Sequence, residues 1–208
     1  MRATIKIRFL SGGNYIMKRQ IRNSVFETNS SSTHSIAIPK SANPISYASF
    51  HTDEFGWELR QANAADYFYT ALYETSDTED KFNERLEKFK NIMNEYGIDY
   101  FLSNPSTHIY HDDYDNKDYF CLDDGHIDHG YELNDFVEEL LNDGDKLIRF
   151  ISGGLVFTGN DNSGDGGFIN RYEEFIEDYD WRTKTTIKYK NDYYMENHED
   201  YEWHYKGN

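Results

Sequence analysis

One long amphipathic stretch, residues 77–96, restricts the fold of this chain more than any other feature. Its apolar residues recur at steps of four, three, four and three, at Phe82, Leu86, Phe89, Met93 and Tyr96. This spacing places them on one face of an α-helix, and such a helix is stable only when a second element covers that face. Ser76 and Glu79 have the spacing of a capping box, and Gly97 marks the end of the helix. The sequence therefore predicts a folded domain built around this helix.

Shorter patterns predict the other elements. Helical periodicity indicates helices over residues 62–74, 132–142 and 168–179. Strands are expected over residues 35–38, 107–111 and 185–190, and a hairpin over residues 146–151 and 155–158, joined through Ser152, Gly153 and Gly154. The expected fold is a loop-rich α+β domain with about four helices packed on a small, mainly antiparallel sheet. We expect this single domain to span residues 17–190, followed by an acidic, aromatic tail over residues 191–208.

Residues 1–16 differ from the rest because they contain three basic residues and no acidic one. Ser11 to Asn14 can be encoded by codons that contain a purine-rich ribosome-binding sequence, a few nucleotides before the codon of Met17. We therefore expect a natural start at Met17 and a non-native leader over residues 1–16. The alternative is an edge strand, since Ile5, Ile7 and Phe9 alternate with polar residues.

The stretch Cys121 to Gly130 contains the candidate metal ligands. Cys121 is the single cysteine of the chain, and His126 and His129 follow it at a C-x4-H-x2-H spacing. A thiolate and two imidazoles suit Zn²⁺, which takes tetrahedral nitrogen and sulfur coordination. A structural zinc ion bound by these three side chains is one interpretation. The other is that Cys121 is a small buried apolar residue and both histidines are ordinary loop residues.

A fourth zinc ligand would have to come from elsewhere in the chain. His34 is the best-placed remote candidate, and it lies in a run dense in hydroxyl side chains from Asn29 to Ser35. Such runs form tight turns in which Ser, Thr and Asn side chains bond to nearby backbone groups. A Ser/His nucleophilic pair is disfavoured here, because neighbouring residues of a strand point to opposite faces.

The charge of the chain limits its partners. The sequence has a formal net charge of −17, and 17% of its residues are aromatic. An aromatic content this high argues against disorder, and the negative charge argues against direct nucleic-acid binding. An acidic surface favours a basic partner, or a protein that occupies a site meant for nucleic acid, although acidity can also serve solubility alone. A single cysteine excludes an internal disulfide, no apolar run is long enough for a membrane span, and no signal peptide is seen, so we expect a location in the cytoplasm.

Four stretches of the sequence form a set of motifs. The first is SVFETNSSSTHS, from Ser24 to Ser35. The others are EFGWE at residues 54–58, IDH at 127–129 and TGNDN at 158–162. In this order they resemble the motifs of an uncharacterised family from phages, prophages and their Gram-positive hosts. Some proteins of this phage-borne kind are anti-CRISPR inhibitors of the RNA-guided DNA nuclease of type II systems. The resemblance thus implies a phage protein that acts in the cytoplasm of a bacterial host.

These observations lead to one functional hypothesis and two alternatives. The hypothesis is a phage-encoded, zinc-stabilised, non-enzymatic inhibitor that binds a type II CRISPR nuclease as a DNA mimic and blocks loading of target DNA. The first alternative is a zinc-dependent hydrolase with Asp128, Glu54 or Asp161 as base. The second is an acidic interaction protein without metal.

Overall fold

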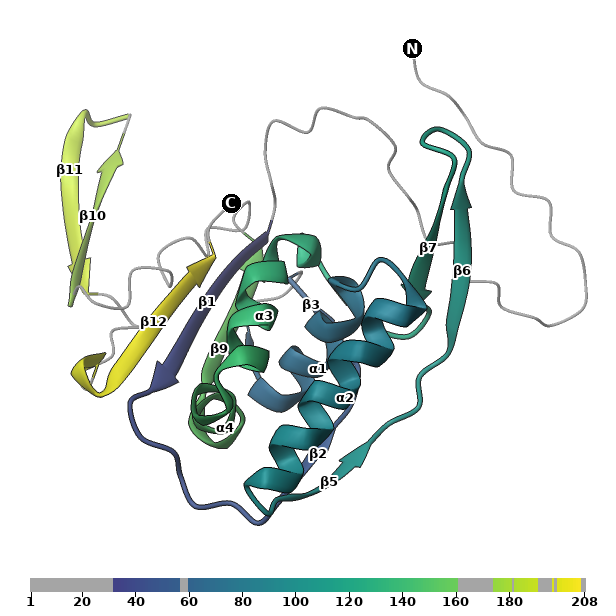
Figure 1. The fold of residues 1–208 in the computed structure, drawn as a ribbon. Coiled ribbons are helices and arrows are strands. Elements are labelled where there is room, and N and C mark those ends of the chain that lie inside the picture. Colours follow the sequence, from purple (N-terminus) through teal and green to yellow (C-terminus); the bar gives the residue numbers. More distant parts are fainter. Residues whose placement is uncertain are drawn as a thin grey trace, which may run out of the picture.

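The computed structural model describes residues 32–56, 60–160, 174–180, 182–190, 196 and 198–206. Its α+β architecture confirms the expected fold class (Figure 1). The α-helices in the described part are α1 (Ala64–Glu74), α2 (Glu79–Glu95), α3 (Asn134–Asn142) and α4 (Gly144–Gly153), with 3-10 turns η1 (Gly130–Leu133) and η4 (His198–Asp200). The strands are β1 (Ser32–Pro39), β2 (Tyr47–Phe50), β3 (Glu54–Phe55), β4 (Arg60–Ala62), β5 (Asp99–Leu102), β6 (Thr107–Asp112), β7 (Lys117–Leu122), β8 (His126–Ile127), β9 (Leu155–Asn160), β10 (Phe175–Asp180), β11 (Thr185–Lys190) and β12 (Tyr201–Lys206).

The main sheet has four strands in the order β12-β1-β9-β4, and every neighbouring pair is antiparallel. Its order joins segments that lie far apart in the sequence, because β1 is flanked by β9 and by the C-terminal β12. Residues 201–206, within the tail expected over residues 191–208, therefore form a strand of this sheet. The expected leader, residues 1–16, lies outside the described residues.

The helices cover one face of this sheet (Figure 1). Helix α1 is buried along almost its whole length, and its N-cap Asn63 accepts hydrogen bonds from the backbone N–H groups of Ala65 and Asp66. The core between helices and sheet includes the fully buried Ile38, Leu72 and Val156. Burial of such side chains is the main source of stability of a domain of this size.

Helix α2 follows the expected amphipathic pattern, since Phe82, Phe89 and Met93 are buried. Its N-cap differs from the expectation, because Thr78 rather than Ser76 accepts a hydrogen bond from the N–H of Lys81. The Ser76 hydroxyl instead donates to the carbonyl of Leu72 at the end of α1. The predicted capping box is therefore wrong, although the helix itself is confirmed.

Two predicted elements have the wrong type. Residues 146–151 lie in helix α4 rather than in a hairpin strand, because the Asp143 side chain caps the helix at the Lys146 N–H and the helix buries Leu147 and Phe150. Of the helix predicted over residues 168–179, residues 168–173 lie outside the described residues, and residues 175–179 form strand β10, because they pair with β11 in register from Phe175 to Asp180. In both places the apolar spacing fits either structure, and contacts with residues outside the segment decide between them.

Smaller strand pairs surround the helical layer. Parallel pairs join β2 to β5 and β3 to β8, while β6 and β7 form an antiparallel hairpin that projects beyond the helices (Figure 1). None of the helices in the described ranges is long and apolar enough to cross a membrane.

Candidate functional site

The described residues of the four resembling stretches, 32–35, 54–56, 127–129 and 158–160, lie on strands and a turn around one buried histidine, His34. On β1, His34 lies directly opposite Thr158 of β9. Its Nε2 lies 3.2 Å from the backbone carbonyl oxygen of Asp128. The neighbouring residue Ile127 belongs to β8, which pairs with Phe55 of β3. Segments separated by more than ninety residues are thus brought together at the end of the core.

Hydrogen bonds fix the state of this imidazole. His34 is 1% exposed, and its Nδ1 lies 3.0 Å from the hydroxyl of Tyr67. A carbonyl oxygen only accepts, so in the neutral ring the hydrogen is on Nε2, and Tyr67 donates to Nδ1. Burial raises the pKa of the Tyr67 hydroxyl, which keeps it protonated as a donor. Both ring nitrogens therefore face groups of the protein.

A polar row crosses the sheet at this level. Thr158 lies opposite both His34 and Arg60, so the three side chains share one face of the sheet. The next row on that face, Ile36, Val156 and Ala62, is apolar and buried. The Thr158 hydroxyl is buried and has no hydrogen-bond partner among the described residues. The polar row is therefore where the apolar core ends.

Arg60 forms the accessible end of this row. Its side chain is 38% exposed and lies 2.9 Å from a carboxylate oxygen of Asp53. The guanidinium also donates to the carbonyl of Glu54, and it lies 4.8 Å from the centre of the Phe55 ring. An arginine held by a carboxylate and an aromatic face is well oriented.

The four predicted zinc ligands contact different groups. Cys121 lies on β7 opposite His108 of β6, and His34 lies between Tyr67 and Asp128. His126 Nδ1 lies 3.1 Å from a carboxylate oxygen of Glu74.

His129 has a left-handed backbone with φ of 59°, and its ring lies 3.6 Å from a carboxylate oxygen of Glu132. Within the described ranges, no group of three or more His, Cys, Asp or Glu side chains is arranged to hold a metal ion. Zinc binding by a ring nitrogen of His34 would break its contact with Tyr67 or with the Asp128 carbonyl. The zinc site stays a prediction.

The three acids expected as bases in a hydrolase lie in different settings. Asp128 adjoins His34 through its backbone, and Glu54 lies on β3 beside Arg60. Asp161 lies outside the described residues. Sequence reasoning missed Tyr67 and Arg60 as neighbours of this site, and no local pattern of either residue could have identified them.

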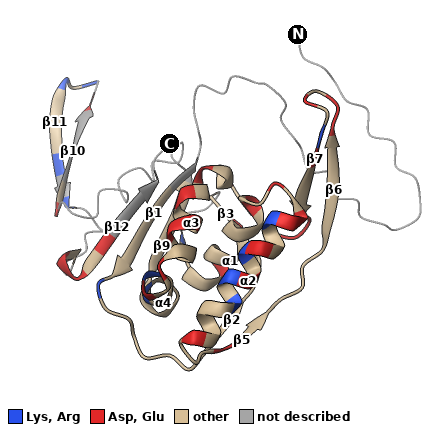
Figure 2. Cartoon of the chain, viewed as in Figure 1, with Lys and Arg blue, Asp and Glu red and all other residues tan. Residues whose placement is uncertain are grey.

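A second feature is the acidic turn of the β6–β7 hairpin (Figure 2). Asp112, Asp113, Asp115 and Asp118 lie in or next to this turn. Tyr114, between them, is 95% exposed. Asp112 accepts a hydrogen bond from the N–H of Tyr114, so the turn has a defined shape.

Two carboxylates of the hairpin change the acidity of their neighbours. The Tyr119 hydroxyl donates a hydrogen bond to the Asp115 carboxylate, and this bond raises the pKa of Tyr119 to about 12. The carboxylate of Asp118, 2.7 Å from His111 Nδ1, raises the pKa of that imidazole. The turn therefore places four carboxylates beside one imidazole and one lysine, so acidic groups predominate in it.

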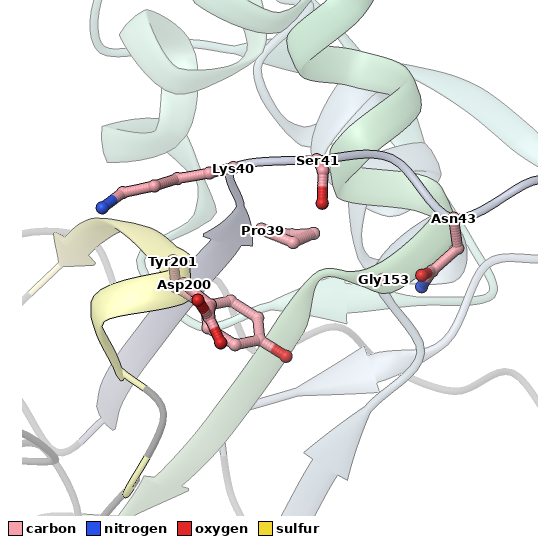
Figure 3. Close-up of a pocket in the computed structure, with 7 residues that line it drawn as sticks. All are labelled: Pro39, Lys40, Ser41, Asn43, Gly153, Asp200 and Tyr201. Carbon is pink, nitrogen blue, oxygen red and sulfur yellow. The ribbon is translucent and has the colours of Figure 1, made fainter.

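A polar pocket of about 400 Å³ opens at the end of β1 (Figure 3). Its lining consists of Pro39, Lys40, Ser41, Asn43, Gly153, Asp200 and Tyr201. The Asn43 side chain is held by the carbonyl of Ser152 at 2.9 Å. None of the predicted zinc ligands and none of the four resembling stretches contributes to this lining, so the pocket is separate from the His34 site.

A comparison of the chain with protein-family models, curated proteins and solved structures found no match. Function is therefore argued from the residues of this chain.

Proposed function

We propose that this protein is a binding inhibitor that docks on the basic nucleic-acid-binding surface of a host enzyme and keeps the nucleic acid out. The partner implied by the resemblance is the RNA-guided DNA nuclease of a type II CRISPR system. The observation that carries the proposal is the β6–β7 hairpin, an acidic and aromatic projection on a chain of net charge −17.

The charge of the hairpin suits a groove that binds phosphates. Asp113 is fully exposed and Asp118 is 68% exposed, whereas the basic Lys117 lies near Asp115. Carboxylates fixed along a projecting strand pair offer negative charge to lysines and arginines that otherwise contact a nucleic-acid backbone. The main contribution of such charges is to the association rate and to partner choice.

The exposed aromatic ring supplies the apolar part of the contact. Tyr114 is 95% exposed at the tip, where burial in a partner's groove would remove most of its surface from water. Tyrosine is over-represented among the residues that dominate binding energy, because its ring is large and its hydroxyl can hydrogen-bond. The carboxylates at the tip thus speed association with a basic partner, and the tyrosine between them supplies buried contact area.

The test is the affinity of the purified protein for the nuclease–guide RNA complex, measured with and without target DNA. We expect the wild-type protein to bind, to compete with DNA and to bind more weakly as salt rises. The triple variant D112N, D113N and D118N should bind roughly tenfold or more weakly. Asparagine keeps the oxygen that accepts the Tyr114 N–H, so the turn should persist.

The matched control carries the same change of charge elsewhere. E84Q, E87Q and E95Q remove three exposed carboxylates from α2. We expect this control to bind nearly as well as the wild-type protein. An equal loss in both variants would assign binding to total charge and not to the hairpin. Absence of wild-type binding, or binding independent of salt, would refute the proposal.

A further inference from the structure

The parallel strand pair β2–β5 presents two large aromatic side chains on one face. In its register Tyr47 lies opposite Asp99 and Ser49 lies opposite Phe101, and side chains two residues apart on a strand share a face. Tyr47 is 59% exposed and Phe101 is 50% exposed. Single exposed apolar residues are ordinary on a protein surface, whereas several gathered on one face mark an interaction site. We call this face, with Tyr47, Ser49, Asp99 and Phe101, the aromatic face.

The opposite face of the same pair is anchored in the core. The ring of Phe50 lies 4.9 Å from that of Phe89 on α2, and the ring of Tyr100 lies 5.9 Å from the same Phe89 ring, measured between ring centres. Helix α2 therefore covers one side of the pair, and β2 and β5 lie beside this helix (Figure 1). Because the inner side chains are fixed, the outer ones hold a defined position on the surface.

His51, directly after β2, extends the aromatic face with a third ring. Its side chain is 52% exposed, and its ring centre lies 5.6 Å from that of Phe101. The backbone N–H of His51 donates to the Asp66 carboxylate at 2.8 Å, which fixes the chain at this point. Three exposed rings thus belong to one surface of two adjacent strands, and flat side chains of this kind accept another flat group stacked on them.

The charge around these rings selects a cationic group. Residues 41–53 and 91–106, which contain both strands, include the acidic Asp53, Glu95 and Asp99 and no lysine or arginine. Figure 2 accordingly shows neither strand with the blue of a basic residue. An arginine guanidinium stacks on an aromatic ring and also pairs with a carboxylate, so a ring beside a carboxylate suits it better than it suits a compact lysine ammonium. Nucleobases also stack on aromatic rings, but their phosphates are repelled by a chain of net charge −17.

We propose that the aromatic face binds an extended, arginine-containing segment of a partner protein. One guanidinium stacks on Tyr47 and pairs with Asp99, and a second stacks on Phe101. Alternate side chains of an extended segment lie on one side, roughly 6–7 Å apart, so arginines two residues apart reach neighbouring rings. This surface goes beyond the docking proposed for the β6–β7 hairpin, and it binds its ligand whether or not the hairpin docks on a nuclease.

The test is the affinity of the full chain for a fluorescent heptapeptide of alternating arginine and valine, measured by anisotropy. We expect this peptide to bind the wild-type protein, and its lysine counterpart of equal charge to bind roughly fivefold or more weakly. Phe101→Ser and Asp99→Asn should each weaken binding of the arginine peptide roughly fivefold, because each removes one of the groups that hold a guanidinium.

Hydrogen exchange locates the bound peptide on the chain. We expect slower exchange of backbone amides in residues 47–51 and 99–103 when the peptide is present. Slower exchange confined to residues 112–118 would place the peptide on the acidic hairpin and refute the proposal. Neither experiment uses the nuclease, so the result is independent of the docking proposed for the hairpin.

The matched controls remove a ring and a carboxylate elsewhere. Tyr131→Ser changes a tyrosine that is 68% exposed, and Glu84→Gln changes a carboxylate on α2 whose side chain is 68% exposed. We expect both to bind the arginine peptide as the wild-type protein does, and circular dichroism will show whether each variant is folded.

Three results contradict an arginine-binding face. Equal affinity of the wild-type protein and folded Phe101→Ser for the peptide would overturn the proposal. Tighter binding of a labelled oligothymidine than of the peptide would replace it by a nucleic-acid site. Self-association of the wild-type protein that is lost in Phe101→Ser would assign the aromatic face to a second copy of the chain.

Discussion

At the scale of single residues, the buried contact between His34 and Tyr67 fixes the site where distant segments meet. The Tyr67 hydroxyl is 3.0 Å from His34 Nδ1, and both residues are almost completely buried. Loss of a hydrogen bond costs more in such a place than at the surface, because water cannot replace the missing partner.

Tyr67→Phe is therefore expected to lower the free energy of unfolding by about 1–3 kcal/mol. Urea denaturation followed by fluorescence measures this change. The control is Tyr131→Phe, which removes a hydroxyl from a side chain that is 68% exposed and should change stability little. A Tyr67→Phe protein as stable as the control would show that the hydrogen bond contributes nothing.

At the scale of elements, the C-terminal strand β12 is tied to the helices by ion pairs. Glu202 of β12 lies 2.5 Å from Lys146 Nζ and 3.1 Å from Arg149, and both basic residues belong to α4. Lys146 also pairs with Glu139 of α3, at 2.6 Å. This network adds side-chain contacts to the backbone ladder between β12 and β1.

The hydrogen bond from Lys146, with a further contribution from Arg149, lowers the pKa of Glu202. The carboxylate therefore stabilises the fold at pH values above the ordinary glutamate pKa of 4.5, and this contribution is lost as pH falls through the lower folded-state value. Glu202→Gln should destabilise the protein at pH 7 and reduce the loss of stability on acidification. Thermal unfolding between pH 7 and pH 3 measures both effects.

Glu95→Gln serves as the control, because Glu95 is an exposed residue at the end of α2. Its pH profile should follow that of the wild-type protein. Identical profiles for Glu202→Gln and the wild-type protein would show that the ion pairs do not hold β12.

At the scale of the whole molecule, several two-stranded pairs lie outside the main sheet. Such small pairs bury little apolar surface, so a bound metal ion would add to the stability of this part of the fold. The four predicted zinc ligands lie on different segments of the chain. These are Cys121 on β7, His126 on β8, His129 directly before η1 and His34 on β1. A structural ion contributes its binding free energy to folding when the unfolded chain does not bind it.

The zinc prediction is tested by elemental analysis of the purified protein. About one zinc ion per chain is expected, with loss of both the ion and thermal stability in Cys121→Ser. His198→Gln, a change in η4 away from the predicted set, should keep the ion. Wild-type protein without zinc would exclude the structural site and the zinc-dependent hydrolase together.

Local patterns predicted a good part of the architecture. The periodicity of residues 77–96 predicts α2, and the Ser35–Ile38 run predicts the centre of β1, because side-chain spacing alone defines which face is buried. Residues 146–151 show the limit of this reasoning. Their apolar side chains fit a strand or a helix, and the Asp143 cap and the packing against β1 select the helix.

What the sequence determined by itself is the acidic, aromatic character of the chain, the α+β class and its best helix, since these depend on composition and on spacing within one segment. Only the tertiary structure decided which residues meet. The sequence of β6 alone places His108 and His111 on opposite faces, and only the strand register shows that His108 lies opposite Cys121. Strand register and helix packing join residues far apart in the chain, so no local pattern encodes the neighbours of His34 or of Cys121.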